Sequence, residues 1–248
     1  MKKLFLSMMA VVASALIADA QTYKVGDLYD VNGLKGIVVK VDDSGQHGLL
    51  MSLDDSPANW CYVNEKKDKE HKSVYTDTEA FDENDGQKNM DAIEKYINET
   101  GITWDYFPLM KWARELGDGW YIPAKNELLD LVKAINGGDT QDTEKLKELN
   151  ERIKEIRGKI KKDTYQGFTT RIGGIIAVTV FNMMYCSTEV EGGNVNIIYF
   201  KENAGSRAKA MVSGKNRVGT FEFAPTYKTY PYNARKTSPI ASRAVHKF

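Results

Sequence analysis

In the middle of the chain, the sequence predicts a very short strand enclosed by two helices. The first helix covers residues 109–116 and is stopped by Gly117-Asp118-Gly119. The strand covers residues 120–123 and ends at Pro123, which favours an extended conformation in the residue before it. Apolar residues then recur at helical spacing over residues 124–136, which predicts the second helix. Helices and strands are therefore both expected, and the fold class that we expect is α+β.

Strands are expected before this central region. Apolar runs at residues 36–41 and 49–53 enclose a polar turn and predict a hairpin, and Asn32-Gly33 marks an earlier tight turn. Residues 64–88 mix both signs of charge and are expected to form a solvated loop. A further helix is expected over residues 89–100, with Gly101 placed to cap its end.

After the central region the chain is rich in strand-forming residues. The candidate strands are Ile172–Met184, Val195–Phe200, Arg217–Phe223 and Ser242–Phe248. Gly192-Gly193-Asn194 predicts a turn between two of them. Residues 224–240 hold three prolines and are expected to form a loop.

A separate helix is expected over about residues 141–162. Its apolar residues follow spacings of three and four, which gives a narrow stripe: Leu146, Leu149, Ile153, Ile156 and Ile160. The favoured interpretation is that this stripe packs on its own domain, because only two to three heptads are present. The alternative is a protruding hairpin or an oligomer seam.

The N-terminus has the order of a secretory signal peptide. Lys2 and Lys3 precede an apolar stretch, and Ala18-Asp19-Ala20 offers the small residues at a cleavage site. The apolar stretch of about 14 residues is shorter than the roughly 20 that a membrane-spanning helix needs. We therefore expect cleavage of residues 1–20 and export of a single domain, residues 21–248, with no integral membrane segment. Periplasm, cell surface and extracellular space all remain open.

Charge and cysteine content limit the partners and cofactors. The formal net charge is zero, which does not favour nucleic acid or an anionic membrane as a partner. Export permits a disulfide between Cys61 and Cys186, and two separate buried thiols are the alternative. The three histidines lie far apart and there is no CxxC, so we expect no metal and no other cofactor.

Four segments, in this order, resemble one family. Asp85-Gly86-Gln87-Lys88-Asn89 fits a "DGxxN" segment, and the stretch from Trp112 through Gly117-Asp118-Gly119-Trp120-Tyr121-Ile122-Pro123 to Glu127-Leu128 is similar to a "W…GxxWxLPTxxEL" signature. Met184-Tyr185-Cys186-Ser187-Thr188-Glu189 is similar to "YWSSTE", and Ser242–His246 to an "RxVR"-type strand. These motifs resemble those of bacterial C-type-lectin-like domains related to the C-terminal domain of collagen-like adhesins.

The resemblance implies a C-type-lectin-like fold with short twisted antiparallel sheets and flanking helices. An N-terminal strand region would cover about residues 23–60, and about residues 136–162 would be a helical insertion. The sequence departs from the family at Cys186, where serine is usual, and at Ala124, where serine or threonine would cap the helix. Loss of that hydroxyl should cost about 1 kcal/mol. Glu127, the other half of the capping box, is kept, so the signature is a folding device rather than an active site.

Little in the sequence favours catalysis. The calcium-binding triplets of true C-type lectins do not occur, and the cluster of Asp82, Glu83 and Asp85 is better explained as a solvated loop than as a calcium site. Formylglycine-generating enzymes share a related fold but use two late cysteines, whereas this chain has only Cys186 late. A nucleophilic Cys186 with His246 as its base is less favoured than a buried core thiol.

Loop aromatics are the remaining candidates for a binding site. They are Trp60, Trp104, Tyr106, Tyr227, Tyr230 and Tyr232, and the last three could form an exposed platform or pack against each other. The leading hypothesis is an exported, non-enzymatic, adhesin-like protein that recognises a glycan or a surface protein. An exported enzyme of unrecognised class is one alternative. A cell-envelope assembly component that associates through the 141–162 helix is another.

Overall fold

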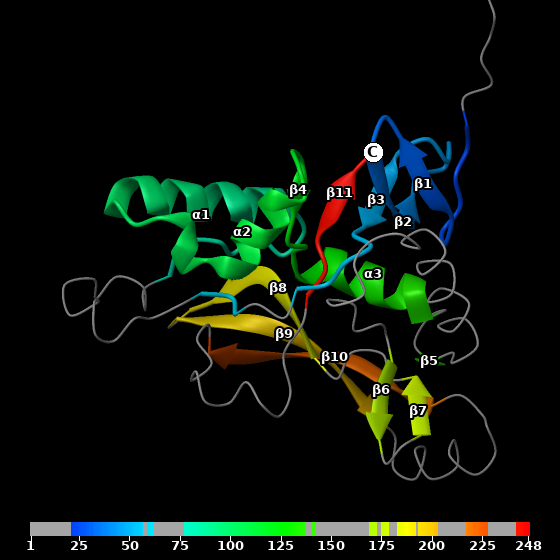
Figure 1. Cartoon of the computed structure of the whole chain (residues 1–248). Coiled ribbons are helices and arrows are strands. Elements are labelled where there is room, and N and C mark those ends of the chain that lie inside the picture. Colours follow the sequence, from blue (N-terminus) through cyan, green and yellow to red (C-terminus); the bar gives the residue numbers. More distant parts are fainter. Residues whose placement is uncertain are drawn as a thin grey trace, which may run out of the picture.

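The computed structural model describes ten segments of the chain. They are residues 21–56, 59–61, 77–136, 140–141, 169–172, 175–178, 183–191, 193–202, 217–227 and 242–248. The structure is a mixed α+β arrangement of small antiparallel sheets with three α-helices among the described residues. The coarse fold class is therefore as predicted (Figure 1).

One sheet joins the two ends of the described chain. Its strands are β1 (Leu28–Val31), β2 (Leu34–Val41), β3 (Gly48–Met51), β11 (Val245–Lys247) and β4 (Trp120–Tyr121), in that order. The turn between β1 and β2 is the predicted one. Asn32 and Gly33 have φ of 52° and 87°, and a two-residue hairpin with a type I′ turn requires positive φ at both positions. β11 pairs with β3 on one side and with β4 on the other, so a strand near the C-terminus joins β4 to the N-terminal strands.

A second sheet has the order β5 (Thr140–Gln141), β10 (Arg217–Tyr227), β9 (Asn194–Glu202) and β8 (Met183–Val190). The predicted turn at residues 192–194 lies between β8 and β9, and Gly193 has φ of 79°. β6 (Thr169–Ile172) and β7 (Ile175–Val178) form a separate two-stranded sheet.

Two predictions for this half of the chain are wrong, and a third is corrected at its first residue. The strand expected over Ile172–Met184 is divided among β6, β7 and β8, because β6 and β7 pair with each other in antiparallel orientation, Ile172 opposite Ile175. β10 continues to Tyr227, where a loop was expected, since residues 224–227 pair with β9. Gln141 lies in strand β5, paired with Arg217, so the expected helix does not begin there. Residues 142–162 lie outside the described residues.

The three helices begin and end close to the predicted positions. They are α1 (Gly86–Thr100), α2 (Pro108–Glu115) and α3 (Lys125–Asn136), with a 3-10 turn, η2, at Trp104–Tyr106. Gly101 caps α1 with φ of 72° and donates its N–H to the Ile97 carbonyl. None of the described helices is long and apolar enough to cross a membrane.

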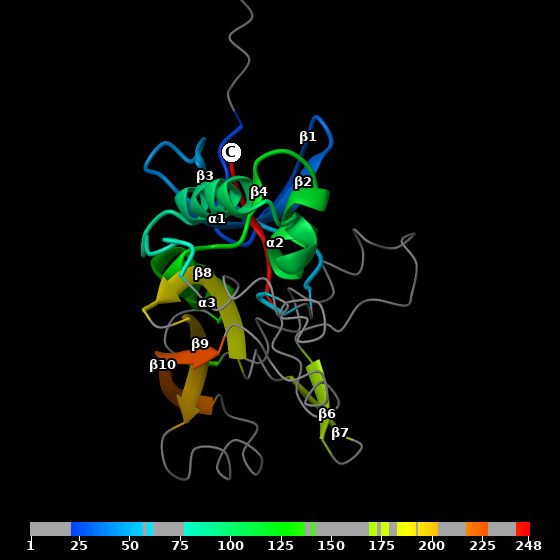
Figure 2. The same cartoon turned by 90° about the vertical axis from the view of Figure 1, so that its left-hand side faces the viewer.

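Helix α3 lies between the two larger sheets. It contacts β2 on one side and β8 and β9 on the other, while α1 contacts β4 and β8 (Figures 1 and 2). The core is continuous from the first sheet through the helices to β8 and β9, with fully buried Leu50, Ile93, Leu128 and Tyr185. The segments at residues 82–89, 124–127 and 187–189 meet where these elements converge.

Candidate functional site

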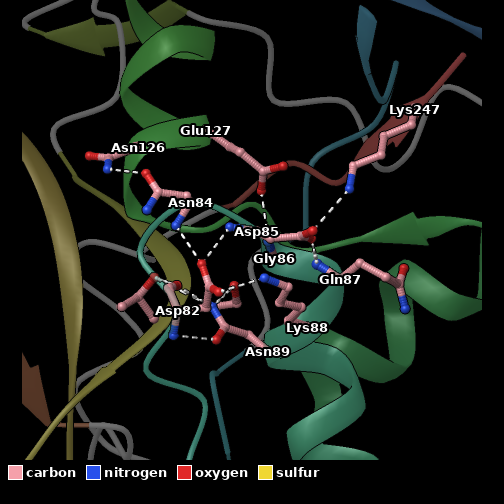
Figure 3. A network of polar contacts seen from close by, with 12 residues as sticks. Asp82, Asn84, Asp85, Gly86, Gln87, Lys88, Asn89, Asn126, Glu127 and Lys247 are labelled. Atoms are coloured by element: carbon pink, nitrogen blue, oxygen red, sulfur yellow. Dashed lines mark hydrogen bonds and ion pairs between the residues drawn. The ribbon is translucent and has the colours of Figure 1, made fainter.

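Many polar side chains of the described residues gather at the N-terminal end of α1. The loop at residues 82–85 enters α1, and it contacts the start of α3, strand β8 and Lys247 of β11 (Figure 3). We call this set the polar network; its members are Thr78, Asp82, Glu83, Asn84, Asp85, Gly86, Gln87, Lys88, Asn89, Tyr121, Lys125, Asn126, Glu127, Ser187, Thr188, Glu189 and Lys247. Three of the four segments that carry the family resemblance therefore meet at one place.

Glu127 is the centre of the network. Its carboxylate is buried, with 7% of the residue exposed, and accepts three hydrogen bonds: from the Gly86 N–H at 2.9 Å, the Ala124 N–H at 2.9 Å and the Tyr121 hydroxyl at 2.7 Å. Burial, and next the charge of Glu127, raises the pKa of Tyr121 far above its usual range. The phenol therefore stays protonated and donates. The predicted half of a capping box, from Glu127 back to Ala124, is present.

The hydroxyl missing at Ala124 is replaced from another part of the chain. Thr188 Oγ1 on β8 accepts the Lys125 N–H at 3.0 Å, and the Glu83 carbonyl accepts the Asn126 N–H at 2.8 Å. The same Thr188 hydroxyl donates to the Asp82 carbonyl at 2.9 Å. The first amides of α3 are thus satisfied by tertiary contacts, so the expected local cost of Ala124 is offset.

Replacing Thr188 by valine is expected to lower the free energy of unfolding by about 1.5 kcal/mol, because it removes an α3 cap and a bond to the Asp82 carbonyl. Urea denaturation followed by circular dichroism measures the loss. The matched control is Thr103→Val, whose hydroxyl accepts the Asp105 N–H at 3.3 Å in an exposed position. That control should cost less than about 0.5 kcal/mol. Equal losses in both variants would contradict the assigned role of Thr188.

Asn89 fastens the loop to α1. Its side-chain oxygen accepts the Asp82 N–H at 2.9 Å, and its nitrogen donates to the Asp82 carbonyl at 2.8 Å and to Ser187 Oγ at 3.0 Å. The amide therefore acts on the Asp82 backbone as a neighbouring strand would. Glu189 holds the preceding residues in a similar way, since its carboxylate accepts the N–H and hydroxyl of Thr78. Of the stretch expected to be a solvated loop, residues 77–85 are therefore anchored by hydrogen bonds and residues 86–88 begin α1.

The three loop carboxylates considered for calcium each have protein partners. Asp82 accepts the N–H groups of Asn84 and Asp85, and the Asn84 bond is the main cause that lowers the pKa of Asp82. Glu83 pairs with Lys125 at 2.6 Å, and Asp85 caps α1 through the Gln87 N–H and pairs with Lys247 at 3.2 Å. Within the described part of the chain, no group of three or more His, Cys, Asp or Glu side chains could hold a metal ion.

The two cysteines are separate buried thiols, the alternative to the disulfide. Cys186 Sγ donates to the Asn196 carbonyl at 3.3 Å, and burial raises the pKa of this thiol to about 12. A thiolate is therefore disfavoured at neutral pH, which is unsuited to a nucleophile. His246 packs its ring against Trp120 and approaches the Asp118 carbonyl with Nε2 at 3.1 Å.

The predicted loop aromatics have different surroundings. Trp60 is fully buried and donates through Nε1 to the Cys186 carbonyl at 3.0 Å, so its assignment to a binding loop is wrong. Trp104 and Tyr106 lie in η2, partly buried, and the Arg114 guanidinium lies 4.3 Å from the centre of a Trp104 ring. Tyr227 ends β10, and nothing is described of its side chain. Tyr230 and Tyr232 lie outside the described residues.

Sequence reasoning missed the exposed part of the polar network. Asn84 and Asn126 are exposed members of the network, and their amides bind each other at 2.7 Å (Figure 3). Phe81, which is also exposed, directly precedes Asp82 in the chain. The available signal was the "DGxxN" segment, which marked the start of α1 but not its contact with α3.

Comparison of the chain with models of protein families, with curated proteins and with solved structures finds no match.

Proposed function

We propose that this chain is an exported, non-enzymatic recognition protein with a C-type-lectin-like fold, which binds a glycan or a surface protein through its loops. The fold assignment is supported by the order of the elements. The residues of the central signature form α2, β4 and the start of α3, where Glu127 accepts the Ala124 N–H. Asn89 of the "DGxxN" segment donates to Ser187 of the segment that is similar to "YWSSTE".

The observation that carries the proposal is that Glu127 and Asp82, two acidic side chains of the polar network, are held by hydrogen bonds and an ion pair within the protein. The groups with catalytic chemistry in the polar network are occupied: Glu127 by three buried donors and Asp82 by backbone amides and Lys88. The charged side chains exposed on the network are paired: Glu83 with Lys125, Lys88 with Asp82 and Lys247 with Asp85. The uncharged groups exposed there are the amides of Asn84 and Asn126, and the ring of Phe81 is exposed in the adjoining segment. Such groups bind and orient a ligand but have no acid, base or nucleophile to offer.

A rigid support favours recognition by exposed loop residues. Ordering a loop on binding costs free energy, and a loop that is already held by its own hydrogen bonds avoids that cost. Residues 82–89 are held in this way by Asn89, Thr188 and Glu127. The loop can therefore offer a preformed surface.

The proposal is tested with the chain of residues 21–248, immobilised and offered to a printed glycan array and to solubilised surface proteins. Saturable binding of at least one glycan or surface protein is expected. A panel of chromogenic hydrolase substrates is run in parallel and should show no turnover. Turnover without any binding would contradict the proposal and favour an exported enzyme.

A further inference from the structure

The exposed amide pair of Asn84 and Asn126 joins two segments distant in sequence. Asn84 Oδ1 accepts from Asn126 Nδ2 at 2.7 Å, and the backbone N–H of each residue is bound in turn, to Asp82 Oδ1 and to the Glu83 carbonyl. The backbone on both sides of the pair is therefore fixed. Each amide uses only one of its two polar ends in this contact. One donor, Asn84 Nδ2, and one acceptor, Asn126 Oδ1, are not used in this contact.

This combination fits a hydroxyl-bearing ligand. A sugar hydroxyl accepts one hydrogen bond while it donates another, so the hydroxyls of a sugar ring match a pair of side chains that offers both a donor and an acceptor. The charged residues that directly precede the two asparagines, Glu83 and Lys125, pair with each other at 2.6 Å, which disfavours a strongly charged ligand. A phosphate or carboxylate would meet the acceptor oxygen of Asn126 and the carboxylate of Glu83. A neutral saccharide meets neither penalty.

An aromatic ring lies in the same loop. Phe81 is 40% exposed and precedes Asn84 by three residues, a separation of at most about 10 Å along the chain. The backbone on both sides of Phe81 is constrained: its N–H donates to the Glu79 carbonyl at 2.9 Å, Glu79 adopts the uncommon φ of 66°, and Asp82 is bound by Asn89. The electron-rich face of an aromatic ring attracts the weakly positive C–H face of a sugar.

Resting on the proposed recognition function, we infer that Asn84, Asn126 and Phe81 form a subsite for a neutral saccharide. The amide pair binds two adjacent hydroxyls, and the Phe81 ring packs against a C–H face of the same sugar or of its neighbour. The subsite requires no metal ion. It is distinct from the Trp104 and Arg114 surface on η2 and α2.

The inference is tested on residues 21–248 with the array glycan that gives the strongest signal and, as simple probes, methyl α-mannoside, methyl β-galactoside and cellobiose. Affinity is measured by calorimetry or by saturation-transfer NMR. The Asn84→Ala/Asn126→Ala double variant and Phe81→Ala should each weaken saccharide binding at least tenfold. Glu99→Gln, which changes an exposed acid near the other end of α1, should leave it within twofold.

A conservative variant separates binding from folding. Asn84→Asp keeps an oxygen that accepts from Asn126 but replaces the remaining donor with a second acceptor, so it should also lose at least tenfold in affinity. Its thermal unfolding midpoint should stay within a few degrees of the unmodified chain.

The outcomes distinguish this inference from the function on which it rests. Saccharide binding that is unchanged in the amide and Phe81 variants would overturn the subsite while the recognition function stands. Capture of a surface protein with no saccharide bound would overturn the subsite in the same way. Absence of all binding would remove both.

Discussion

Replacing Glu127 by alanine is expected to lower the free energy of unfolding by about 4 kcal/mol, the largest loss we predict for a single polar side chain. The change leaves the N–H groups of Gly86 and Ala124 and the hydroxyl of Tyr121 without their common acceptor in a buried place. Each unsatisfied buried donor costs about 1–3 kcal/mol. Urea denaturation followed by circular dichroism at pH 7 measures the difference.

Two further variants make this test specific. Glu127→Gln keeps one acceptor oxygen and the size of the side chain, so its loss should be roughly half as large. Glu99→Ala removes an acid that is 63% exposed and pairs with Lys95 at 3.9 Å, so it should cost less than about 0.5 kcal/mol. If the Glu127→Ala and Glu99→Ala variants had the same free energy of unfolding, the hydrogen bonds of Glu127 would not stabilise the fold.

Replacing Gly86 by alanine is expected to cost at least about 3 kcal/mol. A methyl group there would lie 2.3 Å from the Ile122 carbonyl oxygen and 2.7 Å from the Ala124 nitrogen, and both are backbone atoms that cannot move aside alone. Helix propensity predicts the opposite sign, since alanine is favoured over glycine within a helix by up to about 1 kcal/mol. The same denaturation measurement decides between them.

Gly101→Ala is the matched control for Gly86→Ala. Gly101 also borders α1, but its φ of 72° is the left-handed conformation and no atom lies within 4 Å of an added methyl group. Only the backbone strain of about 1–2 kcal/mol should be seen. A Gly86→Ala chain as stable as the unmodified one would mean that the loop and the strand β4 do not approach as closely as described.

The helices could be predicted from the sequence because their signals are local. Gly101 and Gly117 lie next to the helices they end, and Pro123 lies one residue before the cap of α3. The Asn32-Gly33 turn is a local signal of the same kind. Such features need only a few neighbouring residues, so they can be read without knowledge of the fold.

The polar network could not be predicted, because its contacts join residues that are distant in sequence. The bond from Gly86 to Glu127 spans 41 residues and the bond from Lys125 to Thr188 spans 63. Trp60 was misassigned for the same reason, since its partner at Cys186 lies 126 residues away. In Ile172–Met184, apolar residues alone did not reveal where one strand ends and the next begins.

We propose that the anchored loop of residues 82–89 recognises a neutral saccharide without a metal ion. Binding of residues 21–248 to a glycan array in the presence of EDTA provides the decisive test. We predict saturable binding of a neutral saccharide whose affinity is the same with EDTA as with added calcium. Binding that EDTA abolishes, or no binding to any glycan under either condition, would contradict the claim.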